Sequence, residues 1–253
     1  MTRNLAVMIA AFGLIAGAST AHAGVQVFGT EDCLGTGCYG TSDPTAGATT
    51  QGLAPGVVTN ATNSYGHSFP FSPSAGDFPG TDQIYVGSVQ TAEHDGYSAS
   101  PERINGPDVM TMNYSSLIGA GQQVSTLTLG IAADDFQFPV FGQPFIVTLN
   151  GMPAPALTAA LESLNETGPV VHFLTVGLSS ALDDPSHTLT LSIDEGGDGG
   201  DGWAVDFLTV GVTTVASEVP EPSTWSMMLA GLGGLAAAVR RSRRGNRMGT
   251  AIA

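Results

Sequence analysis

The chain has 253 residues, of which 42% are hydrophobic and 11% are charged. This hydrophobic content is sufficient for a folded core, and 34 glycines and 15 prolines favour a loop-rich β protein over long salt-bridged helices. Residues 24–218 hold 21 of the 22 acidic residues and one basic residue, Arg103. Such a negative body repels nucleic-acid phosphates and anionic lipid headgroups, so we expect no nucleic-acid partner.

Residues 1–23 have the layout of a secretory signal peptide. Arg3 is followed by an apolar run over residues 5–18, and the segment ends in Ala21-His22-Ala23. We expect signal peptidase to cleave after Ala23. The alternative is a short buried helix or a retained anchor.

Residues 24–80 are rich in Gly, Thr, Ser and Pro, a composition that favours turns and an irregular, mostly superficial segment. Cys33 and Cys38 are the two cysteines of the chain. In an exported protein such a pair most simply forms a local disulfide, whereas a metal site requires more thiol or imidazole ligands nearby. We therefore predict a Cys33–Cys38 disulfide, with metal ligation or free thiols as the alternatives.

Residues 81–217 are expected to form the folded domain, because β-branched and aromatic runs alternate with turn residues. The predicted strands are 82–90, 109–117, 124–132, 145–150, 170–178, 187–193 and 203–215. Asn150-Gly151 is a hairpin signal, and Leu157, Leu161 and Leu164 have helical spacing. The sequence therefore predicts a mainly β fold, an antiparallel β-sandwich or jelly roll with one short helix.

Alternation within two of these runs predicts which side chains point inward. Each run places three apolar residues on one face and Thr or Ser on the other. The predicted core-facing residues are Leu127, Leu129 and Ile131 in one strand, and Leu189, Leu191 and Ile193 in another.

Residues 192–207 form the most suggestive candidate for a ligand site. Ca²⁺ is bound by six to eight oxygens, and an acidic, glycine-rich turn can supply carboxylates and carbonyls with little steric hindrance. The candidate ligands are Asp194, Asp198, Asp201 and Asp206. This segment also resembles the closing strand of secreted lectin-like jelly rolls, a resemblance that implies a structural calcium. The alternative is a solvated acidic loop in which Asp206 accepts hydrogen bonds from backbone amides.

Other candidate sites carry fainter signals. Residues 93–95 could contribute to a metal site, and Asp134 with Asp135 could act as the acid and base of a hydrolase. Four aromatic residues could stack on sugars, although each also suits a core position. They are Tyr85, Tyr97, Tyr114 and Trp203. The chain has no G-x-S-x-G, H-E-x-x-H, C-x-x-C or P-loop pattern, so we do not expect a familiar enzyme class.

The C-terminal region combines three elements in order. Residues 219–225 contain Val219, Pro220, Glu221, Pro222 and Trp225, and the prolines keep this segment extended. The apolar run over residues 225–239 would be about 22 Å long as a helix, which is short for a hydrocarbon core of about 30 Å. An arginine-rich end follows, which favours a cytoplasmic location for this end. Its arginines are Arg240, Arg241, Arg243, Arg244 and Arg247.

Residues 218–247, which precede a short tail over 248–253, resemble the PEP-CTERM sorting domain. The sorting region over residues 218–247 is also labelled "ice-binding protein C-terminal", a name that gives no reason to expect ice binding. The resemblance implies a Gram-negative-type bacterium, processing by the membrane transpeptidase exosortase and an association with exopolysaccharide and biofilm. It also implies a transient anchor in the inner membrane before delivery to the cell surface or extracellular matrix.

Taken together, these features predict an exported, non-enzymatic interaction or carbohydrate-binding module. Its processing partners would be signal peptidase and exosortase, its further partner an extracellular polysaccharide, and calcium its one candidate cofactor. The alternative function is a secreted, carboxylate-dependent hydrolase that acts on polysaccharide. Fold alone cannot separate these functions, because sandwich folds support both.

Overall fold

The computed structural model of the chain describes residues 21–40, 43–49, 52–68, 71, 73–88, 103–136, 144–164, 169–196, 202–217 and 226–235. The chain divides into two compact units, Met1–Ala216 and Ser217–Ala253. The first unit is the body of the protein and contains all the described strands.

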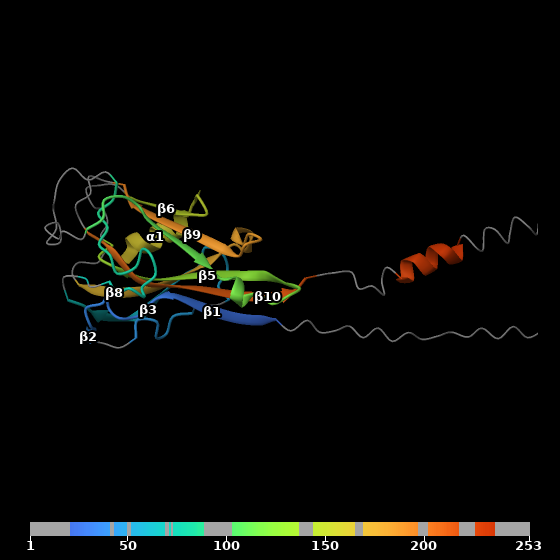
Figure 1. Cartoon of the computed structure of the whole chain (residues 1–253), viewed down its shortest axis with the longest axis horizontal. Coiled ribbons are helices and arrows are strands. Elements are labelled where there is room, and N and C mark those ends of the chain that lie inside the picture. The colour runs from blue at the N-terminus through green and yellow to red at the C-terminus, as the bar shows by residue number, and fades with distance from the viewer. Residues whose placement is uncertain are drawn as a thin grey trace, which may run out of the picture. The chain divides into compact units, whose positions relative to one another are not determined.

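A six-stranded antiparallel sheet forms one layer of the body, in the order β1-β10-β5-β8-β3-β2 (Figure 1). Its strands are β1 (His22–Gly29), β2 (Tyr39–Gly40), β3 (Val58–Gly66), β5 (Gln122–Asp134), β8 (Val170–Leu178) and β10 (Ala204–Ala216). The first and last strands of the body are therefore neighbours in one sheet.

A four-stranded antiparallel sheet, in the order β4-β9-β6-β7, forms the second layer. Its strands are β4 (Asp108–Asn113), β6 (Phe145–Leu149), β7 (Met152–Pro153) and β9 (Thr188–Glu195). The predicted hairpin signal joins β6 to β7, with φ of 49° at Asn150 and 74° at Gly151. Both φ values are positive, as a type I′ turn requires.

The main hydrophobic core contains the inward-facing side chains of both sheets. All six residues predicted to face inward are fully buried in it, in β5 and in β9. The predicted antiparallel β-sandwich is therefore confirmed. The predicted helix is also present as α1 (Pro155–Leu164), which buries Leu157 and Leu161.

The segment over residues 24–80 is more than the irregular surface region that its composition predicts. It supplies most of β1 together with β2 and β3, and β1 pairs with β10 along its whole length. Cys33, Leu34 and Tyr65 are buried in a second core cluster that also contains Phe173 and Phe207. The two sides of the six-stranded sheet are thus both partly covered, and this segment belongs to the sandwich.

Two 3-10 turns, η1 (Ser115–Leu117) and η2 (Ser180–Leu182), connect strands of the body. Over residues 82–88, the described part of the strand predicted at 82–90, the structure instead has a set of isolated bridges. Tyr85 pairs with Ile104 and with Trp203, and Gly87 pairs with Gly106. A left-handed φ of 77° at Gly87 interrupts extended geometry at this point.

Strand β1 begins before the predicted signal-peptidase cleavage point. His22 and Ala23 pair with Thr214 and Thr213 of β10. Cleavage after Ala23 would therefore leave Gly24 as the first residue of the strand. Residues 1–20 of the predicted signal peptide lie outside the described part of the chain.

The C-terminal unit contains a helix over residues 226–235. Its large apolar side chains are exposed, among them Met227, Leu229 and Leu235 at 63%, 66% and 67%. Within the described residues, every helix is too short or too polar to span a membrane.

Candidate metal centre

Three aspartates that are far apart in the sequence converge in the body. Asp32 lies in the loop after β1, Asp82 in a turn before the Tyr85 bridge, and Asp206 on β10. One carboxylate oxygen from each lies within 4.8 Å of the others. Asp82 and Asp206 are fully buried, and Asp32 is half-buried.

Backbone pairing to β10 explains this convergence. The Asp82 N–H donates to the Val205 carbonyl at 2.9 Å, which brings Asp82 beside the residue that follows Val205. Gly29 at the end of β1 pairs with Phe207, so Asp32 begins its loop close to the same part of β10. The candidate metal centre therefore lies beside β10. The end of β1 brings Asp32 to it, and the turn that contains Asp82 brings the third carboxylate.

The disulfide loop supplies hydrogen-bond donors to two of the carboxylates. Cys33, Leu34 and Gly35 have successive left-handed φ values of 65°, 57° and 70°. The Leu34 N–H donates to Asp206 Oδ1 at 2.9 Å, and the Gly35 N–H donates to Asp32 Oδ1 at 2.7 Å. Successive N–H groups in such a turn form a concave surface for anionic oxygens.

The predicted Cys33–Cys38 disulfide is present and closes this loop. Cys33 is buried, while Cys38 is exposed and lies beside β2. Both cysteines are oxidised in this disulfide, so the alternatives of metal ligation and free thiols are wrong.

Tyr65 of β3 completes the surroundings of Asp206, because its hydroxyl donates to Asp206 Oδ2. Burial and the negative charge of Asp206 raise the pKa of Tyr65, so this hydroxyl keeps its proton at neutral pH. Asp206 is thus oriented through both carboxylate oxygens, by an N–H group and by a phenol.

The three carboxylates repel one another. Burial, followed by the negative charges of Asp206, Asp32 and Asp77, raises the pKa of Asp82 to about 10. Burial also raises the pKa of Asp206, although the Tyr65 and Leu34 donors oppose this rise. A proton or a cation is needed to keep such a cluster in a buried position.

The calcium ligands predicted from residues 194–206 do not gather around Asp206 in the part of this segment that is described. Asp194 Oδ1 accepts from the Ser88 N–H at 2.8 Å, and Asp194 Oδ2 accepts from the Ser88 hydroxyl at 2.5 Å. Asp198 and Asp201 lie outside the described residues. Asp206 has Asp32 and Asp82 as its acidic neighbours, and no sequence spacing signals this arrangement.

Asp134 and Asp135, the carboxylates of the hydrolase alternative, are 1% and 4% exposed. Asp134 Oδ1 lies 3.0 Å from Nε2 of His67, which is also buried. Asp134 therefore forms a buried pair with His67 at the end of β5, where solvent has little access.

The aromatic residues considered for sugar stacking pack inside the body where they are described. Tyr85, Tyr114 and Trp203 are 6%, 0% and 1% exposed, and Tyr85 stacks on Trp203. Tyr97 lies outside the described residues, as do residues 93–95. Tyr39 on β2, by contrast, is 53% exposed.

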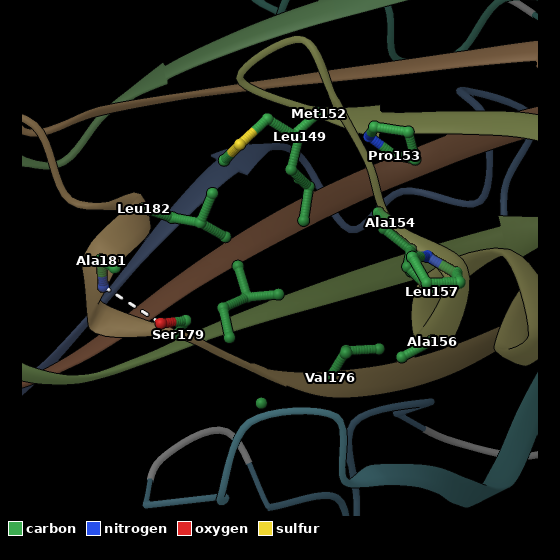
Figure 2. Close-up of a pocket in the computed structure, with 13 residues that line it drawn as sticks. Leu149, Met152, Pro153, Ala154, Ala156, Leu157, Val176, Ser179, Ala181 and Leu182 are labelled. Atoms are coloured by element: carbon green, nitrogen blue, oxygen red, sulfur yellow. Dashed lines mark hydrogen bonds between the residues drawn. The ribbon is translucent and has the colours of Figure 1, made fainter.

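A cavity of about 360 Å³ opens between α1, the β6–β7 hairpin and η2 (Figure 2). Leu149, Met152, Leu157 and Leu182 contribute apolar side chains to it, and Ser179 uses its hydroxyl to cap the Ala181 N–H at 3.2 Å. None of the lining residues is titratable, so the cavity offers no group for acid–base chemistry.

The residues of the sorting signal, from Val219 to Trp225 and from Arg240 to Arg244, lie outside the described part of the chain. Comparison with protein families nevertheless matches the PEP-CTERM protein-sorting motif to residues 218–244. No curated protein and no solved structure matched the chain. The motif implies export, processing by exosortase and sorting to the cell surface, so the chain carries the signal of an exosortase-sorted surface protein.

Proposed function

We propose that this protein is a non-enzymatic component of the extracellular matrix, which exosortase releases or attaches at the cell surface and whose body interacts with extracellular polysaccharide. The observation that carries the proposal is the PEP-CTERM motif at residues 218–244. The apolar helix over 226–235 supports a transient stay in the inner membrane, because its exposed methionine and leucine side chains favour an apolar environment. The signal peptide is proposed on its sequence pattern.

The burial of the candidate catalytic carboxylates supports polysaccharide binding over polysaccharide hydrolysis. A glycosidase needs two carboxyl groups that flank the scissile bond in an accessible cleft. Asp134 is instead paired with buried His67, and the described cavity has no acidic lining residue. Tyr85, Tyr114 and Trp203 are buried in the core and do not reach the surface. Tyr39, within the described residues, is exposed and can offer its aromatic ring to a sugar.

Mass spectrometry of surface-located protein from a host that carries exosortase tests the sorting step. We expect a mature C-terminus within residues 219–225 and no peptides from 226–247. Glu221→Ala should block processing, because it changes the centre of the Pro-Glu-Pro motif. Glu166→Ala removes the same charge outside the matched residues 218–244 and should be processed normally. Surface protein that retains residues 225–247 would contradict the proposal.

A glycan array probed with the full chain tests the interaction step. We expect binding to neutral polysaccharide fragments without product release, because the negative body repels acidic ones, and weaker binding after Tyr39→Ala. Val109→Ala is the matched control, because Val109 is also 53% exposed but lies on β4 of the other sheet. Release of shortened oligosaccharides by the wild-type chain would instead favour the hydrolase.

A further inference from the structure

We propose that Asp32, Asp82 and Asp206 bind a calcium ion that fastens the disulfide loop and the Asp82 turn to β10. The first support is geometric, because one oxygen from each residue lies within 4.8 Å of the others. Two oxygens on opposite sides of one Ca²⁺ are separated by about twice the Ca–O distance of 2.3–2.6 Å, or about 5 Å. The three carboxylates are therefore close enough to share one ion.

Asp82 provides the second, independent support. Its side chain is fully buried, and no N–H or hydroxyl donor among the described residues reaches either carboxylate oxygen. Asp206 can hydrogen-bond to it only when one of the two carboxyl groups is protonated. A buried carboxylate without a partner is strongly unfavourable, and a cation at this position would remove that penalty.

The surroundings of Asp32 and Asp206 resemble the outer shell of a metal site. The Gly35 N–H holds Asp32, while the Leu34 N–H and the Tyr65 hydroxyl hold Asp206. Hydrogen bonds of this kind orient ligating carboxylates and leave further lone pairs on the same oxygens for a metal ion. Asp82 has no such donors, so both of its oxygens are available to the ion.

The donor set selects the class of cation. All three ligands are carboxylates, and the nearby Cys33 is oxidised in the disulfide, which leaves no thiolate for a soft metal. Hard cations such as Ca²⁺ and Mg²⁺ prefer oxygen, and Ca²⁺ tolerates the irregular geometry of a loop, a turn and a strand. Extracellular modules bind Ca²⁺ with dissociation constants of about 0.1–1 mM, a range suited to an exported protein.

Thermal unfolding of the purified full-length chain tests the site at fixed ionic strength, in calcium, in magnesium or in chelator. With Ca²⁺ at about ten times its Kd, the melting temperature should rise by about 3–6 °C over the chelator value. Magnesium should give a smaller rise. This test uses isolated protein, so its result does not depend on whether the proposed sorting or polysaccharide binding is correct.

Asp82→Asn should abolish the calcium-specific rise. In chelator the same variant should melt no lower than wild type, because an amide fills the same space as the carboxyl group and carries no negative charge. Asp32→Asn provides a second variant at a half-buried position, in case Asp82→Asn fails to fold. Asp194→Asn is the matched control: it removes one negative charge beside Ser88 and should keep the full calcium response.

Three outcomes would overturn the proposal. The first is an equal melting temperature in calcium and in chelator, which would mean that a proton neutralises the cluster. The second is a calcium response that survives both Asp32→Asn and Asp82→Asn. The third is a response lost only with Asp194→Asn, which would place the ion in the acidic loop after β9.

Discussion

His67 Nε2 lies 3.0 Å from Asp134 Oδ1, and the two side chains form a buried pair in the interior of the body, which is ionic when His67 is protonated. His67 directly follows β3 and Asp134 ends β5, so the pair joins two strands that are separated by β8. Burial is the largest single influence and lowers the pKa of His67. The hydrogen bond and charge of Asp134, the Ser68 carbonyl and the charge of Asp206 together outweigh burial and raise it.

We expect His67→Ala to lower the free energy of unfolding by about 3–5 kcal/mol, because Asp134 would remain buried without its partner. Urea unfolding at pH 6 measures the loss. His187→Ala is the control, since its pair with Asp183 is partly exposed and should contribute about 1 kcal/mol or less. Equal losses in the two variants would show that burial of the His67 pair has no energetic consequence.

Gly177 on β8 lies directly under the loop over residues 52–57. A Cβ at this position would lie 2.2 Å from the backbone oxygen of Ala54, so a side chain must displace main-chain atoms. We expect Gly177→Ala to destabilise the protein by about 1–3 kcal/mol, as overpacked sites do. Chemical denaturation checks this value. Gly76→Ala, where a Cβ would have no neighbour within 4 Å, should be nearly neutral.

Asp108 at the start of β4 should make stability depend on pH. Burial raises its pKa from 3.8 to about 7, against hydrogen bonds from Tyr85 and the Val109 backbone. Between these two values the folded state holds a proton that the unfolded state has lost, so the contribution of Asp108 to stability falls as pH rises from about 4 to 7.

Asp108→Asn should therefore behave like the protonated wild type. We expect its stability advantage over wild type to be near zero below pH 4, to grow to a few kcal/mol by pH 7 and then to level off. Unfolding titrations of both proteins from pH 3.5 to 8.5 give the difference. An advantage that is constant across this range would assign the effect to packing.

The disulfide loop should control calcium affinity, because it carries Asp32 and the Leu34 N–H donor to Asp206. We expect the double variant Cys33→Ala, Cys38→Ala to lose stability at or below the low end of the usual 2–4 kcal/mol, since the closed loop is short. It should also weaken calcium binding about tenfold, as loss of outer-shell support does. Calorimetric titration with calcium measures the affinity, and unchanged binding would show that the loop keeps its shape without the disulfide.

Much of the sandwich could be predicted because its strands alternate strongly. In β5 and β9 the leucines and isoleucines alternate with threonine and serine, and one buried face follows directly from that pattern. Strand β3 has no such signal: it reads VTNATNSYG, and among its first eight residues only Ala61 and Tyr65 are buried. The Asn and Ser residues of β3 have low strand propensity, and the hydrogen-bonded pairing of β3 with β8 overrides this low propensity.

The candidate metal centre could be predicted only in part. The sequence draws attention to Asp206 because of the acidic, glycine-rich segment before it, but the same pattern suggests Asp194 as its neighbour. The structural neighbours, Asp32 and Asp82, come from regions that read as ordinary turns. Their proximity depends on the β1–β10 pairing and on the Asp82–Val205 hydrogen bond, which are long-range contacts that no local pattern specifies.

The position of β10 also determines how the body responds to mechanical force. This strand of 13 residues has β1 on one side and β5 on the other, and the chain passes from Ala216 into the tail. Under the proposed attachment of the processed body by exosortase near residues 219–225, drag from flow would enter the fold at the end of β10. The strand can leave only by sliding between two partners, so hydrogen bonds along both of its edges bear the force together. A tether at this point resists extraction better than one at an edge strand such as β2 or β7.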